Sequence, residues 1–327
     1  MARPLRIEYE NAFYHITVRG NEKRIIFADD FDRDIFLEIV NEAYKRFSFI
    51  IHAFVLMNNH FHFLIETPSA NLCSSMRHIN GVYTQAYNRR HKRVGHLFQG
   101  RYKSIVVDRD AYYLELIRYI HLNPWRAGIV RRLDDFKYSS HKAIVDKQWG
   151  RRWKMWYDGD VILREFGRSE GEAIRHYREF VNAGKEMDNP LNNAIGGYAL
   201  GERSFADWLW QEFLDGRESR ELTGVSKIRP HINISKLISA VGQEYGLKAD
   251  DVFKRGTVKS GSNIGRAMAL YIISRHTGMT QREIGNVAGG INRTAVSETV
   301  RRFKRLIAED ADIRRRYEQI LKKIRCH

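Results

Sequence analysis

The sequence has few cysteines and no long apolar run, and both features limit what the protein can be. Two of its 327 residues are cysteine, Cys73 and Cys326, and they are far apart without CxxC spacing. Neither a disulfide framework nor a cysteine zinc site is therefore indicated. No uninterrupted apolar run approaches the length of a membrane span, and the first residues, MARPLRIEYENAF, lack the apolar segment of a secretory signal. We expect a cytoplasmic protein without a membrane partner.

The formal net charge is +16, and it is unevenly distributed. Residues 1–150 carry 23 Lys and Arg against 16 Asp and Glu, and residues 151–230 carry 13 against 14. Residues 231–327 carry 19 against 9. Two basic blocks separated by a neutral one suggest two nucleic-acid surfaces on one chain, because a uniformly basic protein would not have a neutral middle. We expect a catalytic domain over 1–150, a helical connector over 151–230 and a DNA-binding domain over 231–327.

The stretch Met57–Glu66, MNNHFHFLIE, places two histidines on one face of a predicted strand. Alternate side chains of a strand share a face, so His60 and His62 point one way and the phenylalanines between and after them point the other. Two imidazoles at this spacing can hold one divalent ion. A half-buried strand whose polar face carries two histidines fits the stretch equally well.

A second element, DRDAYYLELIRYIHLNP, follows about sixty residues later. Asp108 is a suitable helix start, and Pro124 predicts the end of the helix. Tyr119 and Asn123 are four residues apart and therefore share a face of this helix. A tyrosine oxygen can attack a phosphodiester and form a covalent intermediate that keeps the bond energy. Tyr112 and Tyr113 are the competing tyrosines on the same helix.

The two motifs together, His60-Phe61-His62 and Tyr119-Ile120-His121-Leu122-Asn123-Pro124, resemble those of the single-tyrosine HUH transposases. The pattern is most similar to the REP-associated tyrosine transposases, and it covers about residues 6–130, including Gln99-Gly100-Arg101-Tyr102-Lys103. The resemblance implies that His60, His62 and Asn123 bind a divalent metal, Mg²⁺ or Mn²⁺. It also implies that Tyr119 attacks single-stranded DNA and leaves a 5′-phosphotyrosine and a free 3′-hydroxyl.

The periodicities predict an α+β fold for the first 130 residues. The order β-α-β-β-α-β-α indicates a ferredoxin-like antiparallel sheet with helices on one face, which is also the fold that the resemblance implies. An all-helical connector and a helix-turn-helix domain would follow. The predicted strands are Ala12–Arg19, Phe49–Leu56, His60–Thr67 and Ser104–Val107, and the predicted helices are Asp29–Phe47, Leu72–Tyr87 and the tyrosine helix.

Basic residues flank the motifs and could line a groove for single-stranded DNA. Phosphate affinity comes from such charges, and an aromatic side chain such as Tyr102 can stack on an unpaired base. A solvated helix end is the alternative interpretation of the first of these runs. The predicted basic contacts are Arg89, Arg90, Lys92, Arg93, Arg101 and Lys103.

The C-terminal part reads as basic helices over Ile234–Tyr245, Gly265–Thr277, Gly278–Gly289 and Arg293–Ala308. A capping box at Thr280–Glu283, a glycine turn and a basic helix predict a helix-turn-helix. Glu283-Ile284-Gly285, Gly289-Gly290 and Thr294-Ala295-Val296 resemble the DNA-binding domain of the replication initiator DnaA. The turn departs from that domain, since Ile291-Asn292-Arg293 stands where the initiator has Arg-Asp-His, so no base preference is implied.

Within this module we expect Arg293, Thr294 and Ser297 to lie nearest the bases of duplex DNA, and Arg301, Arg302 and Arg305 to meet phosphates. A basic bundle that binds a protein is the alternative. For the whole chain we expect a transposase that acts on single-stranded hairpin DNA and also binds duplex DNA, with a homodimer possible. A non-catalytic regulator that binds hairpin DNA or RNA, and a replication-initiation nickase, are the alternatives.

Overall fold

The computed structural model describes residues 6–153, 156–157, 159–214, 233–254, 261–277 and 279–325. The chain forms two compact units, one spanning Leu5–Phe205 and one containing Ala206–His327. Residues 151–205, expected in a separate connector, group with the first unit. The division into three domains at 150 and 230 remains a prediction. In the described residues no helix is long and apolar enough to cross a membrane.

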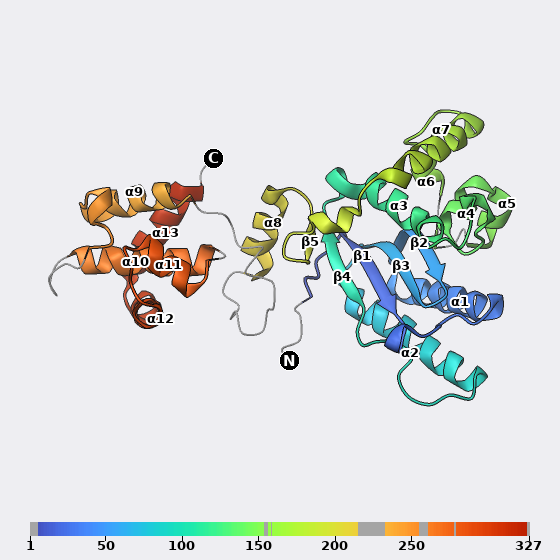
Figure 1. Ribbon diagram of the computed structural model, residues 1–327, viewed down its shortest axis with the longest axis horizontal. Coiled ribbons are helices and arrows are strands. Elements are labelled where there is room, and N and C mark those ends of the chain that lie inside the picture. Colours follow the sequence, from blue (N-terminus) through green and yellow to red (C-terminus); the bar gives the residue numbers. More distant parts are fainter. Residues whose placement is uncertain are drawn as a thin grey trace. The chain divides into compact units, whose positions relative to one another are not determined.

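The first unit is built on a five-stranded sheet of order β2-β3-β1-β4-β5 (Figure 1). Its central strand β1 (Ala12–Arg19) pairs antiparallel with β3 (His60–Thr67) and with β4 (Lys103–Val107), and β2 (Ile50–Met57) pairs antiparallel with β3. The first four strands have the order of a ferredoxin-like sheet. The predicted α+β fold is confirmed.

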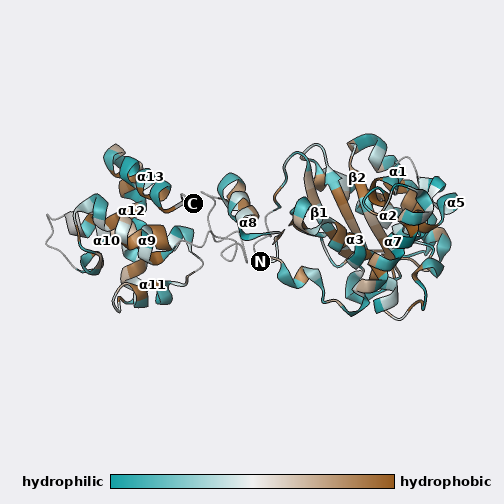
Figure 2. Ribbon diagram, turned by 90° about the horizontal axis from the view of Figure 1, so that it is seen from above, coloured by the Kyte–Doolittle hydropathy of each residue, from teal (hydrophilic) through white to brown (hydrophobic). Residues whose placement is uncertain are grey.

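Helices cover both faces of this sheet. The apolar side chains of β3 meet α1 (Asp30–Phe47), where the Phe36 ring lies 4.8 Å from Phe61 and 6.1 Å from Phe63, and α1 packs beside α2 (Leu72–Arg90). On the other face α3 (Arg109–Arg126) packs on β2 and β3 (Figure 1). The structure therefore differs from the expectation of helices on one face. Figure 2 shows the apolar strands enclosed by helices with hydrophilic outer surfaces.

The sheet also has a strand that the sequence did not predict. The short strand β5 (Ala199–Leu200) pairs parallel with the end of β4, so the sheet is not wholly antiparallel. Its two residues are fully buried. They come much later in the sequence than the His60–His62 and Tyr119–Pro124 motifs. Two residues carry too little alternation for a sequence pattern to reveal a strand.

The tyrosine helix α3 continues past its proline. Pro124 lies inside the helix, which ends at Arg126 rather than at Asn123 as expected. Proline lacks an N–H, so the carbonyl of Ile120 loses its usual partner in the helix. The side-chain nitrogen Nδ2 of Asn123 donates to this carbonyl at 3.3 Å and to the backbone carbonyl of Tyr119 at 2.9 Å. Asn123 thus compensates for the missing donor, and the last turn persists.

Residues 133–193 add short helices that are anchored to α3 through buried polar groups. These helices are α4 (Ser140–Val145), α5 (Lys147–Gly150), α6 (Asp160–Leu163) and α7 (Glu170–Ala183). The Tyr177 hydroxyl lies 2.7 Å from Nδ1 of His121 and 2.9 Å from Nδ1 of His141. On its other side His121 contacts the Ser140 hydroxyl at 2.5 Å. All four side chains are almost fully buried, so this segment is part of the fold that carries α3.

The second unit is helical, as expected. The boundary between the two units falls within α8 (Arg203–Leu209). After a π-helical turn at Trp210–Leu214, the second unit contains α9 (Ile234–Tyr245), α10 (Gly261–His276), α11 (Gln281–Val287), α12 (Arg293–Glu309) and α13 (Ala311–Arg325). One apolar core joins α9 to α13. Gly278, the expected start of one helix, lies outside the described residues. The helix α13 was not predicted from the sequence.

The start of α11 and the turn that follows α11 contain the capping box and the glycine turn expected from the sequence. Thr280 and Glu283 form the predicted capping box at the start of α11. Gly289 and Gly290 adopt φ of +83° and +84°, where only glycine is unstrained. A Cβ on Gly285 would lie 2.0 Å from the carbonyl oxygen of Ile291, so the close approach of the turn to α11 requires glycine there.

Candidate functional site

The histidine face of β3 lies against β1, whose polar side chains complete it. In the antiparallel register Thr17 is opposite His62 and Arg19 is opposite His60, so these side chains share one face. Nδ1 of His62 lies 3.0 Å from Nε2 of His15 and 3.1 Å from the Thr17 hydroxyl. His62 is 6% exposed and His15 2% exposed. The His62 ring is therefore held from the side of its Nδ1 atom.

His60 is held from the same side of its ring by another residue. Its Nδ1 lies 2.7 Å from the side-chain oxygen of Asn59. The His60 and His62 rings lie 5.1 Å apart. Because the Nδ1 atom of each ring is engaged by the protein, Nε2 is the atom that each can offer to a metal ion.

Tyr119 is the tyrosine of α3 that faces the histidines. Its ring lies 6.1 Å from the His62 ring and 6.1 Å from the His15 ring, and the Arg126 guanidinium lies 5.5 Å from its centre. Burial raises the pKa of Tyr119, and the charge of Arg126, a hydrogen bond with the Asn189 side chain and the charge of Arg19 counteract that rise. Positive charge near a phenol favours the phenolate, which is the nucleophilic form.

The competing Tyr113 has a different environment. Its hydroxyl lies 2.9 Å from Nδ1 of His52, and Nε2 of His52 lies 2.8 Å from the Glu66 carboxylate. Burial raises the pKa of Tyr113 to about 12. The Tyr113 hydroxyl is therefore engaged by His52 within the interface of α3 with β2 and β3. The Glu66 carboxylate is engaged by the same histidine and not by His60 or His62 in this chain of contacts.

The candidate donors are of the types that bind a divalent ion with open coordination positions. They would be two imidazole nitrogens, from His60 and His62, and the side-chain oxygen of Asn123, whose nitrogen is used by its own helix. In the described ranges no group of three His, Cys, Asp or Glu side chains could hold a metal. The contacts that the structure gives Asn123 are with its own helix rather than with the histidines.

The electrostatics of the site suit metal ligation. Burial lowers the pKa of His60 to about 4, with a further contribution from the charge of Arg19. Burial also lowers the pKa of His62 well below its usual range, and the neighbouring histidines and Arg19 lower it further. Both imidazoles are therefore neutral near pH 7, which is the form that binds metals.

A pocket of about 460 Å³ opens beside His62. Besides His15, Thr17 and His62, its lining includes three basic residues, Arg19, Arg101 and Lys103. The segment that carries two of them is held at the end of β1, where the backbone N–H of Gln99 donates to the carbonyl of Arg19. A basic pocket beside a candidate metal site is suited to a phosphate of a nucleic-acid strand.

Arg19 and His15 belong to this site, although neither was predicted from the sequence to do so. The sequence places both on the first strand, four residues apart on one face. The pattern does not show that β1 pairs with β3, so it could not place Arg19 opposite His60. The sequence feature that could have indicated Arg19 is its positive charge at the end of a predicted strand, just before Gly20.

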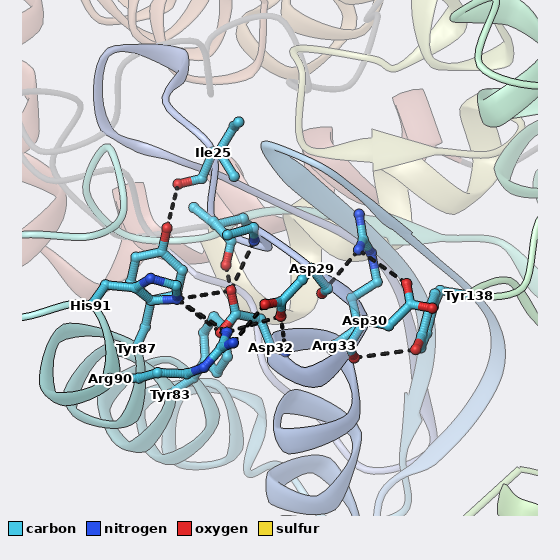
Figure 3. Close-up of polar contacts among 12 residues, drawn as sticks. Ile25, Asp29, Asp30, Asp32, Arg33, Tyr83, Tyr87, Arg90, His91 and Tyr138 are labelled. Atoms are coloured by element: carbon cyan, nitrogen blue, oxygen red, sulfur yellow. Dashed lines mark hydrogen bonds and ion pairs between the residues drawn. The ribbon is translucent and has the colours of Figure 1, made fainter.

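The basic run at the end of α2 is partly neutralised. The Arg90 guanidinium forms ion pairs with Asp29 and Asp32 at 2.5 Å, and Nε2 of His91 lies 3.0 Å from the Asp32 carboxylate (Figure 3). Asp32 is 1% exposed. The charge of Arg90 therefore holds α1 against α2, whereas Arg89 and Lys92 are exposed.

Two further side chains of the predicted groove are engaged within the protein. Tyr102 is 6% exposed, beneath the Arg6 guanidinium at 3.6 Å, and its hydroxyl donates to the sulfur of Cys73. This position does not favour stacking of Tyr102 on a base. Arg93 is half-buried with its guanidinium 5.8 Å from the Tyr87 ring.

The predicted DNA-reading helix of the second unit presents its polar residues to solvent. Val296 and Phe303 of α12 are buried in the helical core. The six predicted contact residues on α12 are all exposed: Arg293, Thr294, Ser297, Arg301, Arg302 and Arg305. Asn292 caps the helix, because its side-chain oxygen accepts from the N–H of Ala295 at 2.8 Å. The six side chains are therefore accessible on the polar face of α12.

Comparison with known families agrees with the features of the first unit. Residues 8–123 match the family model of transposases described as IS200-like. Over these residues the chain is similar to the IS200-like transposases. The matched range contains His60, His62, Tyr119 and Asn123, and the transposase resemblance stated from the sequence is confirmed.

Curated relatives match the other resemblance. The chromosomal replication initiator protein DnaA of Campylobacter jejuni (serotype O:23/36, strain 81-176) is 24% identical over 163 residues, which cover 46% of this chain and 36% of the relative. The DnaA protein of Thermodesulfovibrio yellowstonii is 31% identical over 93 residues, covering 28% of this chain and 21% of the relative. The chain thus spans about a third or less of these relatives. The DnaA-like resemblance of the C-terminal region is confirmed.

One solved structure is also similar to the chain. It is described as a REP-associated tyrosine transposase bound to a REP hairpin. Its sequence is 20% identical, and the match covers 49% of this chain and 93% of that chain with a TM-score of 0.39.

Proposed function

We propose that the first unit cuts and rejoins single-stranded DNA with Tyr119 as the nucleophile and a divalent metal held by His60, His62 and Asn123. The observation that carries this proposal is the position of Tyr119, whose ring lies 6.1 Å from the His62 ring next to a basic pocket lined by His62, Arg19 and Lys103. A nucleophile, a metal-binding pair and a phosphate-binding pocket are the parts that the reaction needs.

The chemical step exchanges one phosphodiester for another. The Tyr119 oxygen attacks the phosphorus, the bond from phosphorus to the 3′-oxygen breaks, and the phenolic proton passes in net terms to the leaving oxygen. The products are a 5′-phosphotyrosine and a 3′-hydroxyl. Attack by a 3′-hydroxyl on the phosphotyrosine reverses the step and joins a new strand without nucleotide hydrolysis. A bound Mg²⁺ or Mn²⁺ would polarise the phosphate and stabilise its charge.

The basic residues of this unit would hold the strand. Arg19, Arg101 and Lys103 line the pocket, and Arg89 and Lys92 are exposed beyond the end of α2. Single-stranded DNA with a hairpin is the proposed substrate. Arg90 would support this surface indirectly, because its ion pairs with Asp29 and Asp32 fix the end of the helix that precedes Lys92 and Arg93.

The second unit would bind duplex DNA through α12. The residues early in the helix, Arg293, Thr294 and Ser297, would reach base edges, and the later arginines would contact phosphates. The supporting observations are the exposure of all six side chains and the similarity of this region to DnaA. We propose that this unit selects the DNA on which the first unit acts.

A covalent-adduct assay tests the proposal. The protein is incubated with end-labelled hairpin single strands and Mn²⁺ or Mg²⁺, denatured, and separated by gel electrophoresis. The proposal expects a labelled band at the mass of the protein plus DNA, present for the wild type, absent for Tyr119→Phe and retained for Tyr113→Phe. Binding of the strands without any adduct would instead identify a non-catalytic binding protein.

A further inference from the structure

The turn between β2 and β3 contains two adjacent asparagines with different partners. The side-chain oxygen of Asn58 accepts a hydrogen bond from Nη2 of Arg33 at 2.6 Å. The side-chain oxygen of Asn59 lies 2.7 Å from Nδ1 of His60. The Asn59 side chain therefore contacts a histidine of the candidate site, whereas the neighbouring Asn58 side chain contacts Arg33.

The orientation of the Asn59 amide follows from its other partner. Its nitrogen, Nδ2, donates to the backbone carbonyl of Lys23 at 3.1 Å. A carbonyl oxygen accepts hydrogen bonds only, so the atom that faces it must be the nitrogen, and the amide oxygen must face His60. An amide oxygen also accepts only, so Nδ1 of His60 must carry the hydrogen. The lone pair of His60 is then on Nε2, the atom available to a metal ion.

The backbone around the turn fixes this arrangement independently of any ion. The N–H of Gly20 donates to the carbonyl of Asn59 at 2.8 Å, and the N–H groups of Ile26 and Phe27 donate to the carbonyl of Asn58 at 2.9 and 3.0 Å. A Cβ on Gly20 would lie 2.1 Å from the carbonyl oxygen of Arg24, so this loop packs at a distance that only glycine allows. The loop that contains Lys23 is thus held against the turn.

We propose that Asn59 is a positioning residue that keeps His60 in the Nδ1-protonated tautomer, so that Nε2 is ready to bind a divalent ion of the Mn²⁺ type. This inference rests on the proposed function for the identity of the metal site. A partner on the second nitrogen of a ligand histidine sets its tautomer and orientation, and losing such a partner typically weakens metal affinity by about 10- to 100-fold.

Two measurements on the full-length protein test the role of Asn59. The first is Mn²⁺ affinity, followed by the electron paramagnetic resonance signal of free Mn²⁺. The second is the tautomer of His60 without metal, read from ¹⁵N NMR of histidine-labelled protein and assigned with His60→Gln. The variants are Asn59→Ala, Asn59→Asp, which keeps an acceptor oxygen, and Asn58→Ala, a matched control in the same turn whose amide faces Arg33.

Asn59→Ala should bind Mn²⁺ at least about tenfold more weakly than the wild type and lose the uniform Nδ1-protonated form. Asn59→Asp should retain that form, and Asn58→Ala should match the wild type in both measurements. Unchanged affinity and an unchanged tautomer in Asn59→Ala would overturn the inference, as would an equal loss in Asn58→Ala. If the wild type binds no Mn²⁺, the proposed metal site fails, and the tautomer in Asn59→Ala alone still decides the role of Asn59.

Discussion

Acidification should destabilise the first unit well before its carboxylates titrate, because several of its histidines are buried in the neutral form. Burial lowers the pKa of His15 to about 3 and holds the pKa values of His62 and His121 well below their usual range. An unfolded histidine has a pKa of about 6.5. Below that value the unfolded chain binds protons that the folded chain does not, so the free energy of unfolding falls as the pH falls.

The size of this effect follows from the same values. At about pH 5.5, each histidine that stays neutral in the folded state costs about 1.4 kcal/mol of stability, so the three together cost about 4 kcal/mol. This loss is a large part of the total stability of a typical domain, about 5–15 kcal/mol. Carboxylates whose pKa is lowered in the fold do not contribute in this pH range. The pKa of Asp134, for example, is held at about 2 by its hydrogen bond with His141, so protonation of Asp134 lowers stability only below about pH 4.

The assay is urea unfolding at about pH 7.5, 6.5 and 5.5, followed by tryptophan fluorescence. Four of the six tryptophans, Trp125, Trp149, Trp153 and Trp156, belong to the first unit, so the signal reports mainly on that unit. His121→Gln should reduce the loss of unfolding free energy between pH 7.5 and 5.5 by about 1.4 kcal/mol, whereas the exposed His96→Gln should not change it. A free energy of unfolding that is constant from pH 7.5 to 5.5 would refute the reasoning.

Three other outcomes can be checked directly. Tyr119→Phe should abolish covalent attachment to labelled hairpin strands but leave their affinity within about twofold in a filter-binding assay; an adduct formed by this variant would remove Tyr119 from the mechanism. His62→Ala should eliminate ion-dependent cleavage, whereas Asn123→Ala should reduce it less, because a neutral amide is a weaker ligand than imidazole; cleavage that persists in EDTA would contradict a metal role. Arg302→Ala should weaken binding to all duplexes and lower the salt dependence by about one charge, whereas Thr294→Ala should change the ranking of duplex sequences. Equal effects of these last two variants on every duplex would show that α12 does not read bases.

Local patterns were sufficient for the four main strands and most helices, and for the faces of those strands. The strands at Ala12–Arg19 and His60–Thr67 have the boundaries that their alternation predicts, and α9 has the boundaries that its helical spacing predicts. The period of two also assigned His62 and Phe63 to opposite faces, since it follows from backbone geometry alone. The capping box and glycine turn before α12 are likewise local features, and the structure contains both.

Contacts between distant residues decided the rest. The sequence shows four Lys and Arg residues near the end of α2, but only the fold brings Asp29 and Asp32 to Arg90, across about sixty residues of chain. The sequence suggests that Tyr102 could stack on a base, but in the fold its ring lies beneath the Arg6 guanidinium. The alternation of residues in a sequence indicates which face of a strand or helix a side chain occupies. The neighbours of that side chain depend on which strands pair and which helices pack together.

The candidate site shows the same division. The sequence supplies the residue types, His60, His62, Tyr119 and Asn123, and the resemblance supplies their expected roles. Only the pairing of β1 with β3 reveals that His15 contacts His62 and that Arg19 lies opposite His60. Only the approach of Lys23 to the turn orients Asn59. The chemistry of a site depends on hydrogen atoms and charges placed by such contacts, and these are fixed by tertiary packing because no single segment contains both partners.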